Sequence, residues 1–146
     1  MILKKIILIL FVILLTGCMA TGPKYKEVQT SIPAIESGKG RIYFYRPANF
    51  MGGGIRPSVN LNGKEVGKST PGGFFYIDRA TGDYEVVLST EVDKKLTFQL
   101  DKGEEQYVRM TAGMGVIVAR VYPELVEQGK ALEEMSGLNY IGQQEK

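Results

Sequence analysis

The side chains that most often perform acid–base chemistry or bind metals are scarce in this chain. It contains no histidine, and Cys18 is its only cysteine. A histidine-based triad and a histidine metal site are therefore ruled out. Carboxylates remain, and the candidate pairs are Glu91 with Asp93 and Glu104 with Glu105. Lysines flank both pairs, as is typical of solvated turns, so we predict no enzyme activity, no catalytic residue, no metal site and no cofactor.

Cys18 follows the features of a lipoprotein signal peptide. Two lysines precede an unbroken apolar run at residues 6–15, which is shorter than the roughly 20 residues that span a bilayer. The run ends in Leu15-Thr16-Gly17-Cys18, which resembles a lipobox. In that pathway the cysteine thiol receives a diacylglyceryl group, and the chain is cleaved just before it. We expect residues 1–17 to be the signal peptide and Cys18 to be the lipid anchor in a membrane.

The alternatives are a secretory peptide followed by a coincidental cysteine, or an uncleaved membrane segment. Met19, rather than Asp, follows the cysteine. In a cell with two membranes, this resembles the signal for export to the outer membrane. We therefore expect a lipid-anchored protein of the bacterial cell envelope, on the outer membrane and facing the periplasm.

The charge of the chain argues against binding to nucleic acid. Its 18 basic residues exceed its 16 acidic ones only through Lys4 and Lys5, which the signal peptide would remove. The other basic residues are spread along the chain rather than clustered. With its only cysteine used for lipid, the mature chain has no disulfide, and a single domain must be stabilised by its hydrophobic core.

Residues 18–39 carry proline, glycine and polar residues without strand-like alternation, which predicts a flexible lipidated tether. Such a coil would reach about 26 Å. However, Tyr25, Val28, Ile32 and Ile35 recur at intervals of three and four residues. Docking of a short helical turn on the domain is therefore the alternative.

From residue 40 to residue 146, short β-rich runs separated by glycine predict one mostly β domain. We expect an antiparallel β-sandwich of about eight short strands with a short C-terminal helix. The predicted strands are 41–46, 58–61, 64–67, 73–77, 83–89, 95–100, 106–111 and 115–122. Asn62-Gly63 predicts a type I′ hairpin turn. Pro123 should end the last strand, before a short edge strand at 124–128 and a helix at 130–136.

Four local patterns follow one another along the chain: the tyrosine-rich strand at 41–47 ending in Arg-Pro, the hairpin at 62–67, the turn and strand at 72–76, and Gly82-Asp83-Tyr84. Together they resemble a family of bacterial envelope lipoproteins, the domain of unknown function 2846. The resemblance implies the fold and the location. It brings no catalytic residues.

The loop at 49–57 is one candidate for binding a partner. It places Phe50, Met51 and Ile55 around three consecutive glycines, and exposed apolar side chains on a loop often mark a contact surface. The alternative is that Phe50 and Ile55 fold back over the open end of the sandwich.

Tyr43, Tyr45 and Arg46 are the other candidate contacts. The two rings share one face of the first strand and would suit a sugar or a cell-wall peptide. Alternatively, Arg46 stacks on tyrosine or pairs with an acid. We expect a non-enzymatic structural or protein-interaction module that docks an envelope protein through its loops or an open strand edge. A lipoprotein that binds cell-wall or surface glycan is the alternative.

Overall fold

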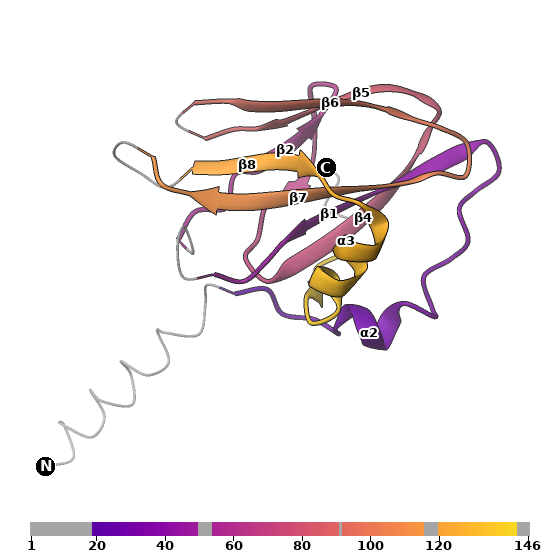
Figure 1. Ribbon diagram of the computed structural model, residues 1–146, viewed down its shortest axis with the longest axis horizontal. Helices are drawn as coiled ribbons and strands as arrows, with labels where there is room; N and C mark the ends of the chain where they lie inside the picture. The colour runs from indigo at the N-terminus through magenta and orange to yellow at the C-terminus, as the bar shows by residue number, and fades with distance from the viewer. Residues whose placement is uncertain (1–18, 50–53, 91, 116–119, 143–146) are drawn as a thin grey trace, which may run out of the picture.

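The computed structural model describes residues 19–49, 54–90, 92–115 and 120–142. These residues form a mostly β sandwich with two short helices (Figure 1). The strands are β1 (Lys39–Arg46), β2 (Ser58–Leu61), β3 (Lys64–Lys68), β4 (Gly73–Ala80), β5 (Gly82–Leu88), β6 (Lys94–Leu100), β7 (Glu105–Gly113), β8 (Arg120–Leu125) and β9 (Asn139–Tyr140), and the helices are α2 (Tyr25–Val28) and α3 (Gln128–Met135). In this part of the chain, no helix is both long enough and apolar enough to cross a membrane.

The strands form two sheets, ordered β8-β7-β1-β4-β9 and β3-β2-β5-β6. The second sheet is antiparallel, as predicted. The first is mixed, because β1 runs parallel to β7 and β4 runs parallel to β9. Parallel neighbours need a long connection, and here the whole second sheet lies in sequence between β1 and β7.

An apolar core fills the space between the sheets. Alternation along β1 turns Ile42 and Phe44 inward. On β4, the neighbouring strand of the same sheet, Phe75 and Ile77 pair with them in register and point to the same core. All four side chains are fully buried, and the rings of Phe44 and Phe75 stack 5.0 Å apart. The hairpin between β2 and β3 turns at Asn62 and Gly63 with φ of 48° and 82°, which confirms the predicted turn.

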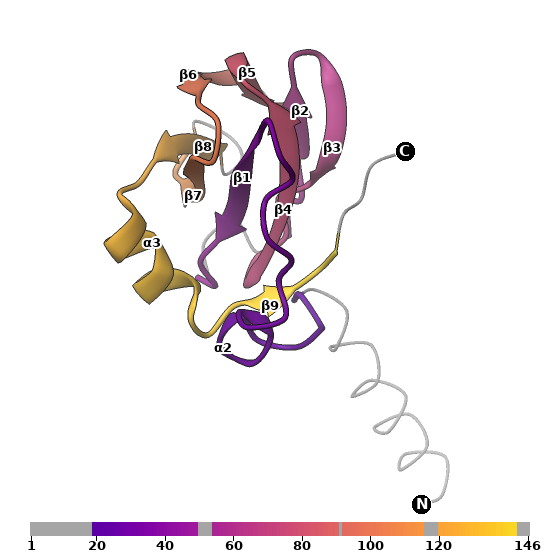
Figure 2. The same cartoon turned by 90° about the vertical axis from the view of Figure 1, so that its right-hand side faces the viewer.

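A second apolar cluster covers the outer face of the first sheet. Tyr43, Tyr45, Phe74 and Tyr107 point to this face and pack under the helices and the β9 region. Figure 2 shows α2, α3 and β9 together on this side of the strands. Met135 of α3 is fully buried there, so the predicted C-terminal helix packs against the sandwich.

The segment before β1 is docked on the domain, so the prediction of a flexible tether at 18–39 is wrong for residues 19–38. Tyr25 N–H donates to the Leu138 carbonyl at 2.8 Å, and Asn139 Nδ2 donates to the Ala20 carbonyl at 2.7 Å. The Tyr25 ring meets Phe74 edge-on at 5.3 Å. The structure agrees with the alternative interpretation of the spacing, in which this segment docks on the domain. Docking buries Tyr25 in the outer cluster.

Pro123 lies inside β8 opposite Met110, rather than at its end. The Tyr107 carbonyl accepts from Val126 N–H, so the odd-numbered residues of β7 bond to β8 and Met110 does not. The nitrogen of Pro123 therefore points away from the sheet, and β8 is an edge strand. A proline costs no ladder hydrogen bond in that position. The predicted strand at 124–128 is the end of β8 followed by the start of α3.

Candidate functional site

The predicted loop contact at 49–57 is only partly within the described residues. Cys18, Phe50 and Met51 lie outside them. Ile55 is half-buried and packs against the core between the sheets. For this residue the structure therefore agrees with the alternative, in which the loop folds back over the end of the sandwich.

Tyr43 and Tyr45 are 3% and 0% exposed, so the two rings proposed to meet a glycan are covered by the second apolar cluster. Burial, more than any neighbour, raises the pKa of Tyr43 to about 12. The hydroxyl of Tyr45 donates to Glu134 on α3 at 2.7 Å. Tyr45 therefore joins α3 to the sheet, and Tyr43 stacks on Tyr107 of the neighbouring strand in the same cluster.

Arg46 is 1% exposed at the end of β1. Its Nη1 donates to the carbonyls of Ile55 at 2.8 Å and Ser69 at 2.9 Å, and so connects the loop after β1 to the turn before β4. Burial, with a smaller effect from Arg56, lowers the pKa of this guanidinium to about 10. Arg46 therefore has a structural position, which agrees with the alternative to ligand binding, and its bonds to these two backbone carbonyls fix it there.

The far side of β4 is an open strand edge. Arg41 N–H bonds toward β7, at the Glu104 carbonyl, while the Arg46 carbonyl accepts from Gly72, which leads into β4. The N–H and C=O groups of Tyr76, Asp78 and Ala80 must therefore point away from β1. On that side β9 pairs only with Gly73 and Phe74, and the described residues contain no other strand next to β4.

Two carbonyls of this edge are already used by side chains. Arg79 Nη1 donates to the Asp78 carbonyl at 3.0 Å, and the Tyr84 hydroxyl donates to the Ala80 carbonyl at 2.7 Å. The outward N–H groups at positions 76, 78 and 80 and the Tyr76 carbonyl are the groups that a further strand would meet.

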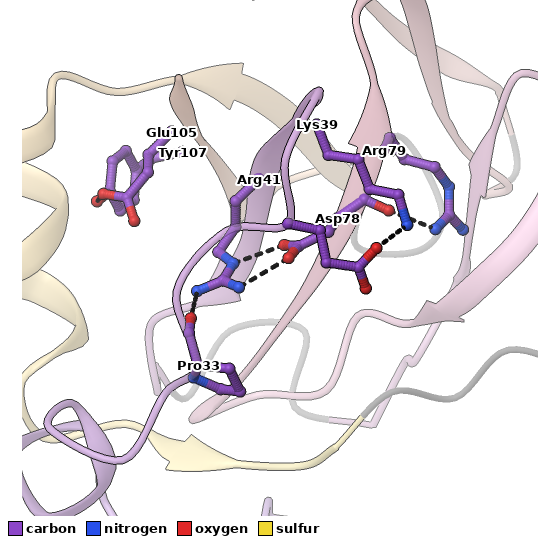
Figure 3. Close-up of polar contacts among 8 residues, drawn as sticks. Pro33, Lys39, Arg41, Asp78, Arg79, Glu105 and Tyr107 are labelled. Carbon is purple, nitrogen blue, oxygen red and sulfur yellow. Dashed lines mark hydrogen bonds and ion pairs between the residues drawn. The ribbon is translucent and has the colours of Figure 1, made fainter. Parts of the chain in front are cut away.

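A cleft of about 300 Å³ lies beside this edge, where the docked segment crosses the sheet. Its lining residues are Pro33, Ala34, Glu36, Lys39, Arg41, Tyr76, Asp78 and Arg79. Arg41 forms its floor: Nε and Nη2 donate to the two carboxylate oxygens of Asp78 at 2.6 and 2.8 Å, and Nη1 donates to the Pro33 carbonyl at 2.8 Å (Figure 3).

The charges of the cleft are paired but differ in exposure. Burial is the largest single effect and would lower the pKa of Arg41, but the interactions with Asp78 and Tyr43 together outweigh it and raise the pKa, so the guanidinium stays charged. At the rim Lys39 pairs with Glu36, whose side chain is 68% exposed. Such surface pairs contribute little stability and exchange partners readily. Glu105 and Tyr107 bond to each other away from the cleft (Figure 3).

This arrangement is suited to recognition of an extended chain. Backbone donors lie along one strand edge, and rim cations next to it can meet carboxylates. In the part of the chain that is described, no group of three or more acidic or sulfur-bearing side chains is placed to hold a metal. Sequence reasoning missed this cleft. The sequence signal that could have revealed it is Arg41, which lies on the same face of the first strand as Tyr43 and Tyr45.

The two sheets and the tyrosine-rich first strand place the protein in the class of mostly β sandwiches. A family model described as "Protein of unknown function (DUF2846)" matches residues 36–122, which is more than half of the chain. The chain belongs to that family. Searches of curated proteins and of solved structures gave no match.

Proposed function

We propose that this protein is a lipid-anchored, non-enzymatic module of the bacterial envelope that binds an extended segment of a partner protein along the open edge of β4. The signal features before Cys18 support the anchor. Met19, the next residue, is 58% exposed, which is compatible with a lipid on its neighbour.

The edge of β4 beyond Phe74, which no strand among the described residues pairs with, is the observation that carries the binding proposal. An added strand gains main-chain hydrogen bonds, and the side chains beside the edge select its sequence. Lys39 and Arg79 line the adjoining cleft, which favours a partner segment with carboxylate side chains. Natural proteins usually cover or shorten such edges, and β9 covers only the first two residues of this one.

Ala80→Pro tests the edge, because proline removes an outward N–H and leaves the bonds to β1 intact. Ala80→Val is the matched control, since it keeps the N–H at the same exposed position. We expect the proline variant to recover at least several-fold less partner from detergent-solubilised envelopes, and the valine variant to recover as much as wild type. Equal recovery by the proline variant would reject the edge as the binding site.

A photo-crosslinking residue at Ala80, with one at exposed Lys102 as control, identifies what binds. A protein adduct from position 80 alone supports the proposal, whereas adducts to peptidoglycan fragments alone would favour the glycan alternative. Cys18→Ala tests the anchor separately. It should abolish incorporation of labelled palmitate, and equal labelling of wild type and variant would disprove lipidation at this residue.

A further inference from the structure

We propose that one end of the sandwich lies directly against the bilayer, so that the domain is held on the membrane surface in a fixed orientation. We name it the anchor end, and define it by residues 19–20, 54–57, 68–72, 89–90, 92–93 and 113–115. The inference rests on lipidation of Cys18 and adds the membrane-facing surface.

Very few residues separate Cys18 from the folded domain. Ala20 N–H donates to the Pro71 carbonyl at 3.1 Å, and the Ala20 carbonyl accepts from Asn139. Ala20 is two residues beyond Cys18, a distance that an extended chain covers in about 7 Å. A free coil of residues 18–39 would instead have allowed about 26 Å. The docked segment therefore brings the anchor end to the headgroup layer.

Strand directions place four connections at this end. β1 ends at Arg46 opposite Gly73, where β4 begins, and β7, which is parallel to β1, ends here too. β2 begins here, because Val59 pairs with Leu88 at the end of β5. In Figure 1 this is the left-hand end, where β5 and β7 end and β6 and β8 begin.

Exposed apolar side chains gather at the anchor end. Among the described residues, the large hydrophobic side chains that are exposed are Met19 at 58%, Val92 at 47%, Met114 at 76% and Leu125 at 41%. The first three belong to the anchor end, and only Leu125, at the other end of β8, does not. Apolar side chains on neighbouring loop tips can enter the interfacial region of a bilayer.

The charge at the anchor end also suits phospholipid headgroups. A cleft of about 220 Å³ beside Ala20 is lined by Met19, Thr21, Arg56, Thr70 and Ile141. Arg56 is exposed, and Lys68 ends β3 at the same end. Asp93 is the only acid among the described residues of the anchor end, and Glu91, in the same connection between β5 and β6, lies outside the described residues. Cations near an anionic lipid surface favour binding.

Tryptophan fluorescence can test this orientation, because the chain has no tryptophan. Met114→Trp and Val92→Trp each place one fluorophore at the anchor end, and Leu125→Trp is the matched control at the other end. Each lipidated protein, purified from bacterial membranes, is reconstituted into vesicles of anionic phospholipid carrying a headgroup-proximal nitroxide. We expect at least a twofold loss of emission for the two anchor-end variants and little change for Leu125→Trp.

The outcomes separate this inference from the anchoring proposal. Mass spectrometry of the same preparations reports whether Cys18 carries lipid. If it does, and all three variants are quenched equally or not at all, the fixed orientation is wrong although the anchor stands. If Cys18 carries no lipid, both proposals fail. Thermal melts in detergent show whether a variant is folded, and since the two anchor-end positions lie on different loops, agreement between them excludes a local artefact.

Discussion

At the scale of single residues, buried charge rather than exposed charge organises the outer face of the first sheet. Arg41 is 3% exposed and bonds to both oxygens of Asp78, while its ring contact with Tyr76 places the guanidinium 4.5 Å from the ring centre. Removing one partner of such a pair leaves a buried charge without compensation. Arg109, which is only partly buried, joins Glu124 to Glu134 on α3.

The pair of Arg109 and Glu124 predicts a pH dependence of stability. The hydrogen bond from Arg109 holds the pKa of Glu124 below its ordinary 4.5, against a smaller opposing effect of burial. Because the folded pKa is the lower one, this stabilisation is complete above pH 4.5 and is lost as the pH falls through the folded value. Glu124→Gln should therefore melt below wild type at pH 7, and the difference should shrink below pH 4.5. A difference that stays constant down to pH 3 would contradict this.

At Gly67 and Gly129 we predict opposite effects on stability when alanine replaces glycine. A Cβ on Gly67 would lie 2.6 Å from Cζ of the fully buried Phe75 ring, whereas a Cβ on Gly129 in α3 meets nothing within 4 Å. Gly67→Ala should lower the free energy of unfolding by about 1–3 kcal/mol. Gly129→Ala should leave it unchanged or raise it by up to about 1 kcal/mol. Urea titrations measure both, and equal effects would show that the Phe75 ring yields.

At the scale of elements, the segment before β1 is a structural part of the sandwich. It supplies Tyr25 to the outer cluster and crosses the sheet at Pro33, whose carbonyl Arg41 holds. A domain that starts at Lys39 would expose Phe74 and the neighbouring tyrosines. Docking therefore explains why the outer face of the sheet tolerates so many aromatic side chains.

Asp78→Asn tests how this segment is held. The single change should cost about 3 kcal/mol or more, because it leaves the buried Arg41 charge unpaired. The double change Arg41→Met with Asp78→Asn removes that charge and should recover most of the loss, while residues 31–36 become sensitive to limited proteolysis. Urea titration and protease digestion measure the two effects. A double variant as unstable as the single one would contradict this account.

Most strands could be predicted from the sequence, because alternation and turn residues are local signals. Ile42 and Phe44 revealed the inner face of β1, and Asn62-Gly63 revealed the hairpin. Docking of the segment was only the alternative prediction, and β9 was not predicted, because Tyr25 and Lys24 find their partners at Leu138 and Asn139, at the other end of the chain. The burial of Tyr43, Tyr45 and Arg46 was also missed, because the residues that cover these side chains lie on other segments of the chain.

At the scale of the whole molecule, the anchor end and the open edge of β4 lie apart. β4 begins at Gly73 on the anchor end, and Ala80 lies about 23 Å further along the strand at 3.3 Å per residue. A membrane-apposed sandwich would thus present residues 76–80 and the cleft away from the lipid. The opposite side of the sandwich is closed, where β6 lies against β8.

The contact between the two ends of the chain also sets the order in which the molecule can be completed. A ribosome releases Ala20 long before Asn139, yet among the described residues the backbone of Ala20 hydrogen-bonds to Asn139 and to Pro71 in the turn before β4. The residues next to Cys18 therefore stay unfolded until nearly the whole polypeptide has emerged. If Cys18 is lipidated as proposed, the modifying enzymes would act during that interval, before completion of the fold withdraws the backbone of Ala20 from them.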